Sequence, residues 1–261
     1  MGIHSMSTLP HSRLVLVTGA AQGIGAGVAR YLAARGYRVA AADLKEAACR
    51  DTVAGLPGDG HSAWAMDISD ERSVDGTYAA IEAAHGPVSA LVCAAGILIL
   101  HDGERRLIAD TSLEEWELTH AVNTRGTFLC TRAFVRARRD TPVEHGRVVT
   151  FSSCAAQLGG YRSSSAYISS KAAVLGYTKA LARETAAMGI TVNGIAPGLI
   201  DTAMLRLSLA DGQEAAAAAN IPLGRLGQPD DIAATIAFLL SPEAGYLTGT
   251  MTDVNGGYRM Q

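Results

Sequence analysis

Short apolar runs alternate with longer helical patterns along this chain. The runs have the length of buried strands and fall at residues 14–18, 38–42, 62–66, 89–93, 147–152, 190–195 and 250–254. Between them, helical patterns cover residues 25–35, 45–54, 71–85, 113–138, 166–188 and 229–240. Strands that alternate with helices are typical of βαβ units. The pattern therefore predicts a doubly wound α/β fold, with seven parallel strands in one sheet and helices on both of its faces.

No Pro- or Ser-rich linker, internal repeat or charge block divides the chain, so we expect a single domain over residues 13–261. Residues 1–12 are expected to form an N-terminal tail. An alanine-rich run at residues 214–220 has strong helix propensity. It lies within residues 199–222, a segment that joins no strand pair directly and that we expect to act as a lid.

Composition narrows the class of protein. The chain has 261 residues, of which 48% are hydrophobic, so a large core is expected. Its formal charge of -3 would attract neither nucleic acid nor an anionic membrane. Because no apolar run is long enough to span a membrane and the start lacks a secretory signal, a cytoplasmic protein is expected. The four scattered cysteines predict neither disulfides nor a metal site.

A glycine-rich turn follows the first predicted strand. The stretch TGAAQGIG places Gly19, Gly23 and Gly25 in a TGxxxGxG pattern, with Gln22 and Ile24 between them. Glycines let the backbone approach a pyrophosphate, whose charge is met by N–H groups at the start of the next helix. Such a turn also occurs as ordinary turn chemistry, but its place between a strand and a helix favours dinucleotide binding.

The second predicted strand ends at Asp43, followed by Leu44. A carboxylate at this position accepts hydrogen bonds from an adenosine ribose and repels a 2′-phosphate. Since only Lys45 stands near enough to neutralise that phosphate, NAD is favoured over NADP as the cofactor. The alternative is that Asp43 simply N-caps the following helix.

Further motifs follow in a fixed order along the chain. They are CAAG at residues 93–96, NTRG at 123–126, FSS at 151–153, YISSK at 167–171, PGLIDT at 197–202 and DVNGGY at 253–258. Together with TGxxxGxG, they resemble the short-chain dehydrogenase/reductase family over almost the whole chain from residue 14. The resemblance implies a Rossmann-type oxidoreductase that moves a hydride between NAD and a secondary alcohol or ketone.

The resemblance also implies catalytic roles. Tyr167 would be the acid/base, Lys171 would lower its pKa and hold the nicotinamide ribose, Ser153 would orient the substrate oxygen, and Asn123 would orient a water of a proton relay. Lowering a phenol pKa from 10 to 7 needs about 4 kcal/mol. An ammonium about 4 Å away supplies about that much at an effective dielectric of about 20. Each residue also has a plain structural interpretation: an exposed helix pair, a loop cap, or a local helix perturbation.

Other residues at the carboxyl ends of the strands would bind the cofactor by the same resemblance. They are Asp67, Ile68, Ala94, Ala95, Gly96, Pro197, Gly198, Ile200 and Thr202. Open α/β sheets bind ligands at this edge. The substrate pocket is expected beside Ser153, with an apolar wall of Leu158, Tyr161, Met204 and Leu205.

The chain departs from the family pattern in three places. Cys93 and Ala94 replace the usual paired asparagines. The gap from Ser153 to Tyr167 is fourteen residues, one more than the commonest spacing, so the connection must bulge and Ser152 is the alternative donor. The stretch at residues 97–112 is also longer. Its Arg105 and Arg106 either anchor an anionic substrate group or form a solvated charge run.

The predicted helices 113–138 and 166–188 carry many small residues. In proteins that this chain resembles, these helices form the faces of a homotetramer. Two other functions stay open. A 3-oxoacyl thioester reductase would call for a basic docking patch and usually NADP, and neither is evident. A sensor or scaffold would bind NAD without turnover.

Overall fold

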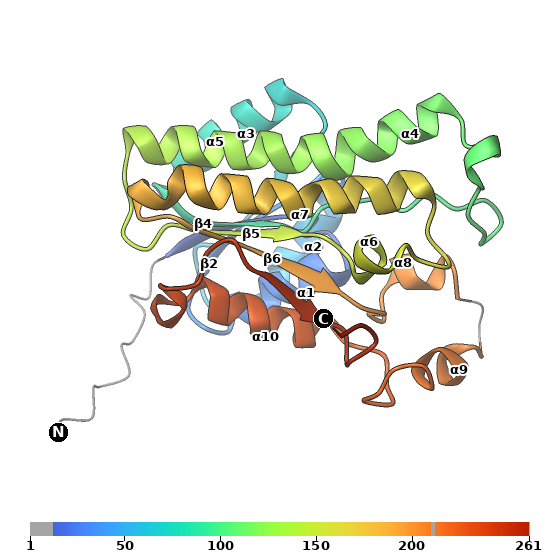
Figure 1. Cartoon of the computed structure of the whole chain (residues 1–261). Helices are drawn as coiled ribbons and strands as arrows, with labels where there is room; N and C mark the ends of the chain where they lie inside the picture. The colour runs from blue at the N-terminus through green and yellow to red at the C-terminus, as the bar shows by residue number, and fades with distance from the viewer. Residues whose placement is uncertain (1–12, 210–211, 261) are drawn as a thin grey trace.

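Seven strands form one parallel sheet (Figure 1). The computed structural model describes residues 13–209 and 212–260, so the expected tail at residues 1–12 lies outside the described part. The strands are β1 (Leu14–Thr18), β2 (Arg38–Asp43), β3 (Ser62–Ala65), β4 (Val88–Cys93), β5 (Arg147–Phe151), β6 (Thr191–Pro197) and β7 (Met251–Val254). Their order is β3-β2-β1-β4-β5-β6-β7. The predicted fold class is confirmed, and the order reverses between β1 and β4, where such sheets bind ligands.

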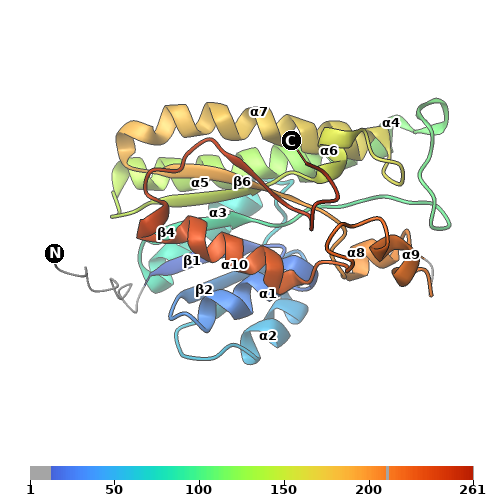
Figure 2. The ribbon, with the colours of Figure 1, turned by 60° about the horizontal axis from the view of Figure 1, so that its bottom comes forward.

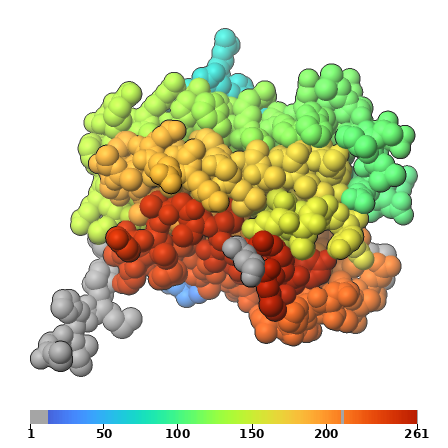
Figure 3. Space-filling view, viewed as in Figure 1, coloured from blue at the N-terminus to red at the C-terminus, as the bar shows by residue number. Residues whose placement is uncertain are grey.

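Helices cover both faces of the sheet (Figure 2). On one face lie α1 (Gly23–Ala33), α2 (Glu46–Ala54) and α10 (Pro229–Leu240). The other face holds α3 (Glu71–His85), α4 (Leu113–His120), α5 (Thr127–Asp140) and α7 (Ser165–Thr185). The surface of this second face is formed largely by α5 and α7, which run side by side in Figures 1 and 3.

Each central strand contributes to two cores. In β1, Val15 and Val17 pack on α1 and α10, whereas Leu14 and Leu16 face the helices on the opposite side. Successive side chains of a strand point to opposite faces, so a strand covered on both faces is apolar throughout. This is why the strands appear in the sequence as unbroken apolar runs.

The helix predicted over residues 113–138 is interrupted. A π-helical turn at Ala121–Gly126 separates α4 from α5. A π turn takes up an extra residue and is frequent at functional sites. It buries Asn123 and brings Gly126 against Ile68, where a Cβ on the glycine would lie 2.6 Å from the isoleucine Cδ1. Beyond it, Phe134 and Arg138 of α5 are buried.

The sequence pattern missed two short helices, α6 (Cys154–Leu158) and α8 (Ala203–Arg206), and located a third, α9 (Glu214–Ala218), only as an alanine run. All three lie beyond the carboxyl ends of the strands. Gly36 lies shortly after α1, and Gly189 is the C-cap of the 3₁₀ turn that follows α7; both have left-handed backbone angles, with φ of 81° and 70°. Among the described residues, no helix combines the length and apolar character needed to cross a membrane.

Candidate functional site

The glycine turn packs so tightly that Gly19 and Gly25 have no room for a side chain. A Cβ on Gly25 would lie 2.1 Å from the carbonyl oxygen of Gly19, and one on Gly19 would lie 2.6 Å from the Cα of Ala95. Gly23 has a φ of 57°, and a Cβ there would lie 3.6 Å from Thr202 Cγ2. Two segments predicted to bind the cofactor, at Ala95 and Thr202, therefore meet this turn.

Asp43 is fixed beside the same turn. Its Oδ2 accepts the Ala21 N–H at 3.3 Å, and its Oδ1 accepts the Lys45 N–H at 3.0 Å. The N-cap of α2 is Lys45, so Asp43 does not cap that helix. The half-buried carboxylate is held at the edge of the site, with exposed Leu44 next to it.

The other predicted cofactor residues differ in exposure. Asp67, Ala94, Ala95, Gly96, Gly198 and Thr202 are half-buried. Ile68 and Ile200 are buried in the two cores and Pro197 ends β6, so little of their side chains faces outward. Gln22 is the N-cap of α1, and half-buried Ile24 packs against the core. A tight glycine turn, the start of a helix and an acidic group together fit a dinucleotide.

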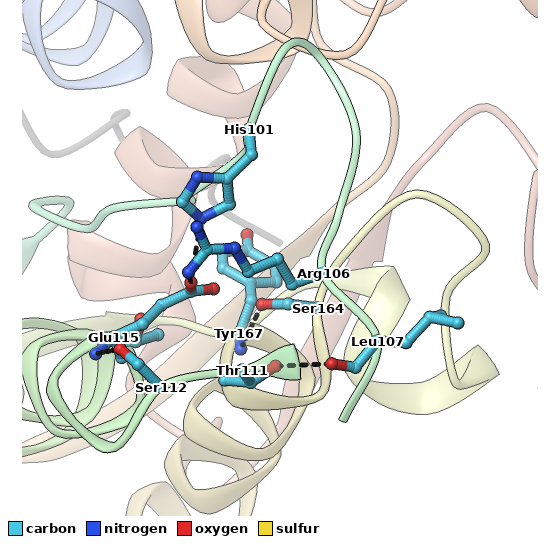
Figure 4. Close-up of polar contacts among 9 residues, drawn as sticks. His101, Arg106, Leu107, Thr111, Ser112, Glu115, Ser164 and Tyr167 are labelled. Atoms are coloured by element: carbon cyan, nitrogen blue, oxygen red, sulfur yellow. Dashed lines mark hydrogen bonds and ion pairs between the residues drawn. The ribbon is translucent and has the colours of Figure 1, made fainter. Parts of the chain in front are cut away.

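Tyr167 and Lys171 lie one turn apart on α7 and are buried, with 9% and 5% of their surface exposed. They are not an exposed helix pair. Ser164 caps α7 by accepting the Tyr167 N–H at its Oγ, 3.3 Å away (Figure 4). Lys171 Nζ donates to the carbonyl oxygen of Phe151, at 3.2 Å. Both side chains therefore reach the carboxyl end of β5.

The charge state of this pair differs from the prediction. Burial raises the pKa of Tyr167 to about 12, a hydrogen bond with the Ser153 side chain lowers it, and Cys154 raises it. Burial also lowers the pKa of Lys171 to about 8, opposed by Cys93. The expected lowering of the phenol pKa by Lys171 is not found, because loss of water dominates for both groups. Tyr167 is a protonated phenol at neutral pH.

Ser153 has two partners. It N-caps α6 by accepting the Ala155 N–H at 3.2 Å, and it hydrogen bonds to Tyr167. The interpretation of this residue as a cap is therefore confirmed, and its catalytic role stays a prediction. Ser152 was the alternative donor, but its Oγ donates to the carbonyl oxygen of Lys171 at 2.9 Å. Because that hydroxyl is committed to the backbone, Ser153 is the better candidate.

Asn123 ties three segments together from the π turn. Its Nδ2 donates to the Ile97 carbonyl and to Ser170 Oγ, both at 3.0 Å, and its Oδ1 accepts the Ile97 N–H at 2.8 Å. A Cβ on Gly96 would lie 3.1 Å from both Asn123 Oδ1 and Lys171 Nζ, so these two polar groups lie close together. Sequence reasoning missed Ser170, whose only signal was its place in YISSK.

The two arginines of the long loop, residues 97–112, have partners within the protein. Arg105 Nη1 donates to the carbonyl oxygens of Gly160 and Ser163, at 3.2 and 3.1 Å. Arg106 Nη1 lies 3.7 Å from Glu115 Oε2. The solvated charge run is therefore wrong for Arg105, whereas its role as an anchor for an anionic group stays a prediction. Arg106 is exposed and also pairs with the buried Glu115 carboxylate.

Glu115 is a residue that sequence reasoning missed. Ser112 caps α4, and the Ser-x-x-Glu spacing favours a capping box. Instead, the Glu115 side chain turns inward, where its Oε2 lies 2.9 Å from His101 Nε2 (Figure 4). Its Oε1 is buried without a hydrogen-bond partner among the described residues.

The expected apolar wall is only partly formed. Leu158 ends α6, Met204 and Leu205 lie on α8, and Tyr161 lies between α6 and α7. Arg162 links these segments by donating to the Ser208 carbonyl at 2.9 Å. Tyr161 is 81% exposed and does not close the wall.

The lowered pKa of Lys171 makes stability depend on pH. Between pH 8 and 10.5 the unfolded chain keeps a proton on this amine that the folded chain has lost. The free energy of unfolding therefore rises with pH across this window, by up to about 3 kcal/mol. Urea unfolding of the wild type and of Lys171→Met at several pH values isolates this contribution, since methionine does not titrate. A difference between the two proteins that stays constant from pH 7.5 to 10.5 contradicts the expectation.

Three comparisons with known proteins relate this chain to the same group of reductases and dehydrogenases. Residues 19–259 match the family model described as Enoyl-(Acyl carrier protein) reductase. The chain is 36% identical to the 3-oxoacyl-[acyl-carrier-protein] reductase FabG of Vibrio cholerae, over 95% of this chain and 98% of the relative. It is 38% identical to the (3R)-3-hydroxyacyl-CoA dehydrogenase of Mus musculus, over 95% and 97%. A short-chain type dehydrogenase/reductase from Mycobacterium marinum matches with a TM-score of 0.87 and 31% identity, over 94% of this chain and 95% of that one. The chain therefore belongs to the short-chain dehydrogenase/reductase family.

Proposed function

We propose that this protein transfers a hydride between NAD and a secondary alcohol or ketone, with Tyr167 as the acid/base. The observation that carries the proposal is the burial of Tyr167 and Lys171 one turn apart on α7, with Ser153 bonded to the phenol, near a tightly packed glycine turn. When bound there, the nicotinamide supplies or accepts the hydride.

The protonation state of Tyr167 suggests how each direction runs. With a pKa of about 12, the phenol carries its proton at neutral pH and can donate it to a carbonyl oxygen held by Ser153. Oxidation of an alcohol requires the phenolate, so it is expected to be faster at alkaline pH. Lys171, whose pKa is lowered to about 8, still carries most of its positive charge at neutral pH. Asn123 stands next to that ammonium, where a water of a proton relay could bind.

The preference for NAD depends on Asp43. Its carboxylate is held by two backbone N–H groups, so it cannot turn away from a 2′-phosphate without losing both bonds. We expect Asp43→Ser to weaken NAD binding and to strengthen NADP binding, moving the ratio of the two affinities toward NADP by about 100-fold, or about 2.7 kcal/mol. Fluorescence titration with NADH and NADPH measures both affinities. An unchanged ratio would remove Asp43 as the determinant.

A 3-oxoacyl thioester is the second candidate substrate. It is favoured by the relatives, which include a 3-oxoacyl-[acyl-carrier-protein] reductase and a 3-hydroxyacyl-CoA dehydrogenase. One observation speaks against a carrier protein as the partner, because arginines of the surrounding segments already have partners within the protein. Arg105 bonds to two carbonyls, Arg162 to Ser208 and Arg206 to Asp201. A basic docking surface is thus not evident around the site in the described residues.

The test of the proposed function is a spectrophotometric panel. Ketones, acetoacetyl-CoA and secondary alcohols are each assayed with NAD or NADP in the appropriate redox state. Turnover of simple ketones or alcohols supports the first candidate, and turnover restricted to acetoacetyl-CoA supports the second. Tight dinucleotide binding with no turnover across the panel would favour a sensor or scaffold.

We also propose that the protein is a homotetramer built on the face formed by α5 and α7 (Figure 3). Phe128 of α5 and Leu118 of the adjoining α4 are exposed although both are apolar. A surface hollow near them is lined by Trp116, His120 and Ala121. A symmetric assembly buries such residues against a second copy.

A further inference from the structure

Two stretches of this chain are longer than the family pattern, and the structure brings them together. One is the connection from Ser153 to Tyr167, and the other is the loop at residues 97–112. Figure 1 shows the loop at the same end of the molecule as α6 and the start of α7. The contact between them is made by Arg105.

Besides the bond from Arg162 to the Ser208 carbonyl, the connection itself contains little that would hold its shape. Ser153 begins α6, which ends at Gly159 with a left-handed φ of 83°, and Gly160 follows with a φ of 53°. Regular structure resumes only at Ser164, the N-cap of α7. Glycines in sequence give a chain the widest choice of backbone conformations. The segment that separates the two proposed catalytic hydroxyls therefore needs an external support.

Arg105 supplies contacts at both ends of this segment. Its Nη1 donates to the Gly160 carbonyl at the beginning and to the Ser163 carbonyl at the end. It is half-buried, whereas its neighbours Glu104 and Arg106 are exposed. A charged donor bonded to two carbonyls forms stronger hydrogen bonds than a neutral one.

We propose that Arg105 is a positioning residue, which clamps the long Ser153–Tyr167 connection so that the two hydroxyls stay within hydrogen-bond reach. The longer loop thus compensates for the longer connection. The inference rests on the proposed function for its catalytic consequence, but the clamp itself does not depend on any substrate.

Hydrogen exchange tests the clamp without a substrate. In Arg105→Gln, peptides that cover residues 159–168 should exchange at least about tenfold faster than in the wild type, and Arg105→Lys should give an intermediate rate because one ammonium can still reach a carbonyl. Arg139→Gln is the matched control, since this arginine is 71% exposed and, within the described part of the chain, pairs only with neighbouring Asp140 at the end of α5. Unchanged exchange over residues 159–168 in Arg105→Gln would overturn the proposal.

Kinetics test the consequence. We expect Arg105→Gln to lower kcat by about 10- to 100-fold, per site that binds NADH, with the NADH affinity unchanged. The hydrogen bond from Ser153 lowers the pKa of Tyr167. If Arg105→Gln breaks this bond, the pH profile of alcohol oxidation should also move to higher pH. Arg105→Lys should recover part of kcat, and Arg139→Gln should match the wild type.

The exchange and the kinetic experiments together distinguish failure of the Arg105 proposal from failure of the proposed function. Faster exchange with kcat per binding site within about twofold of the wild type would overturn the positioning role, because the support would then be structural only. If the wild type turns over nothing in the panel, the proposed function fails, while the exchange rates still decide whether Arg105 clamps the connection.

Discussion

Replacing Tyr167 with phenylalanine is expected to abolish turnover while leaving dinucleotide binding in place. Phenylalanine keeps the aromatic ring that packs in this buried position and removes only the hydroxyl that bonds to Ser153. Proton transfer by a positioned side chain contributes about 10²- to 10⁴-fold to a rate. We therefore expect kcat to fall about 1,000-fold, with the NADH dissociation constant within about twofold of the wild type.

Two measurements decide this prediction. Steady-state kinetics on the best substrate of the panel give kcat, and fluorescence titration with NADH gives the affinity. A small change in the thermal unfolding temperature does not affect this test, because kcat is calculated per site that binds NADH. Turnover within about tenfold of the wild type would show that another group moves the proton.

The second large effect is expected from Gly25→Ala. The added methyl group would lie 2.1 Å from the Gly19 carbonyl oxygen and 2.7 Å from its carbon. Both atoms belong to the backbone of the turn, which cannot yield without changing the shape proposed to cradle the pyrophosphate. Overpacking at such a position costs about 1–3 kcal/mol of stability. We expect the affinity for NADH to fall at least about 100-fold.

Gly76→Ala is the matched control for this substitution. Gly76 lies within α3, and a Cβ placed on it would meet no atom within 4 Å. Alanine is the better helix former, so the control should gain up to about 1 kcal/mol of stability with an unchanged affinity for NADH. Calorimetric titration with NADH and urea unfolding measure both quantities. Wild-type affinity in Gly25→Ala would mean that the turn does not hold the cofactor.

Much of the fold could be predicted because its signals are local. All seven strands fall within a few residues of the predicted ranges, since strands buried on both faces must be apolar throughout. The glycine turn was equally visible, because its backbone excludes side chains at Gly19 and Gly25. The short helices α6 and α8 were not, since a segment of four or five residues shows no complete helical period.

The charge state of the site could not be predicted, because it depends on burial in three dimensions. Spacing alone brings Tyr167 and Lys171 to one face of a helix, but the pKa values depend on how much water each group loses. The same holds for Arg105 and Glu115, whose partners Gly160 and His101 lie in other segments of the chain. The residues around Arg105 and Glu115 in the sequence are typical of an exposed surface.

The π turn at Ala121–Gly126 constrains how this chain can change in evolution. The turn takes up one extra residue, so α5 keeps its buried face toward the sheet. An insertion or deletion in the regular helix directly beyond it would not be taken up, and everything downstream in α5 would rotate by about 100°. Phe134 would leave the core, and Arg138 would lose its bond to the Val88 carbonyl. Natural changes of length should therefore be found in surface loops or at this turn, and not between the turn and Arg138.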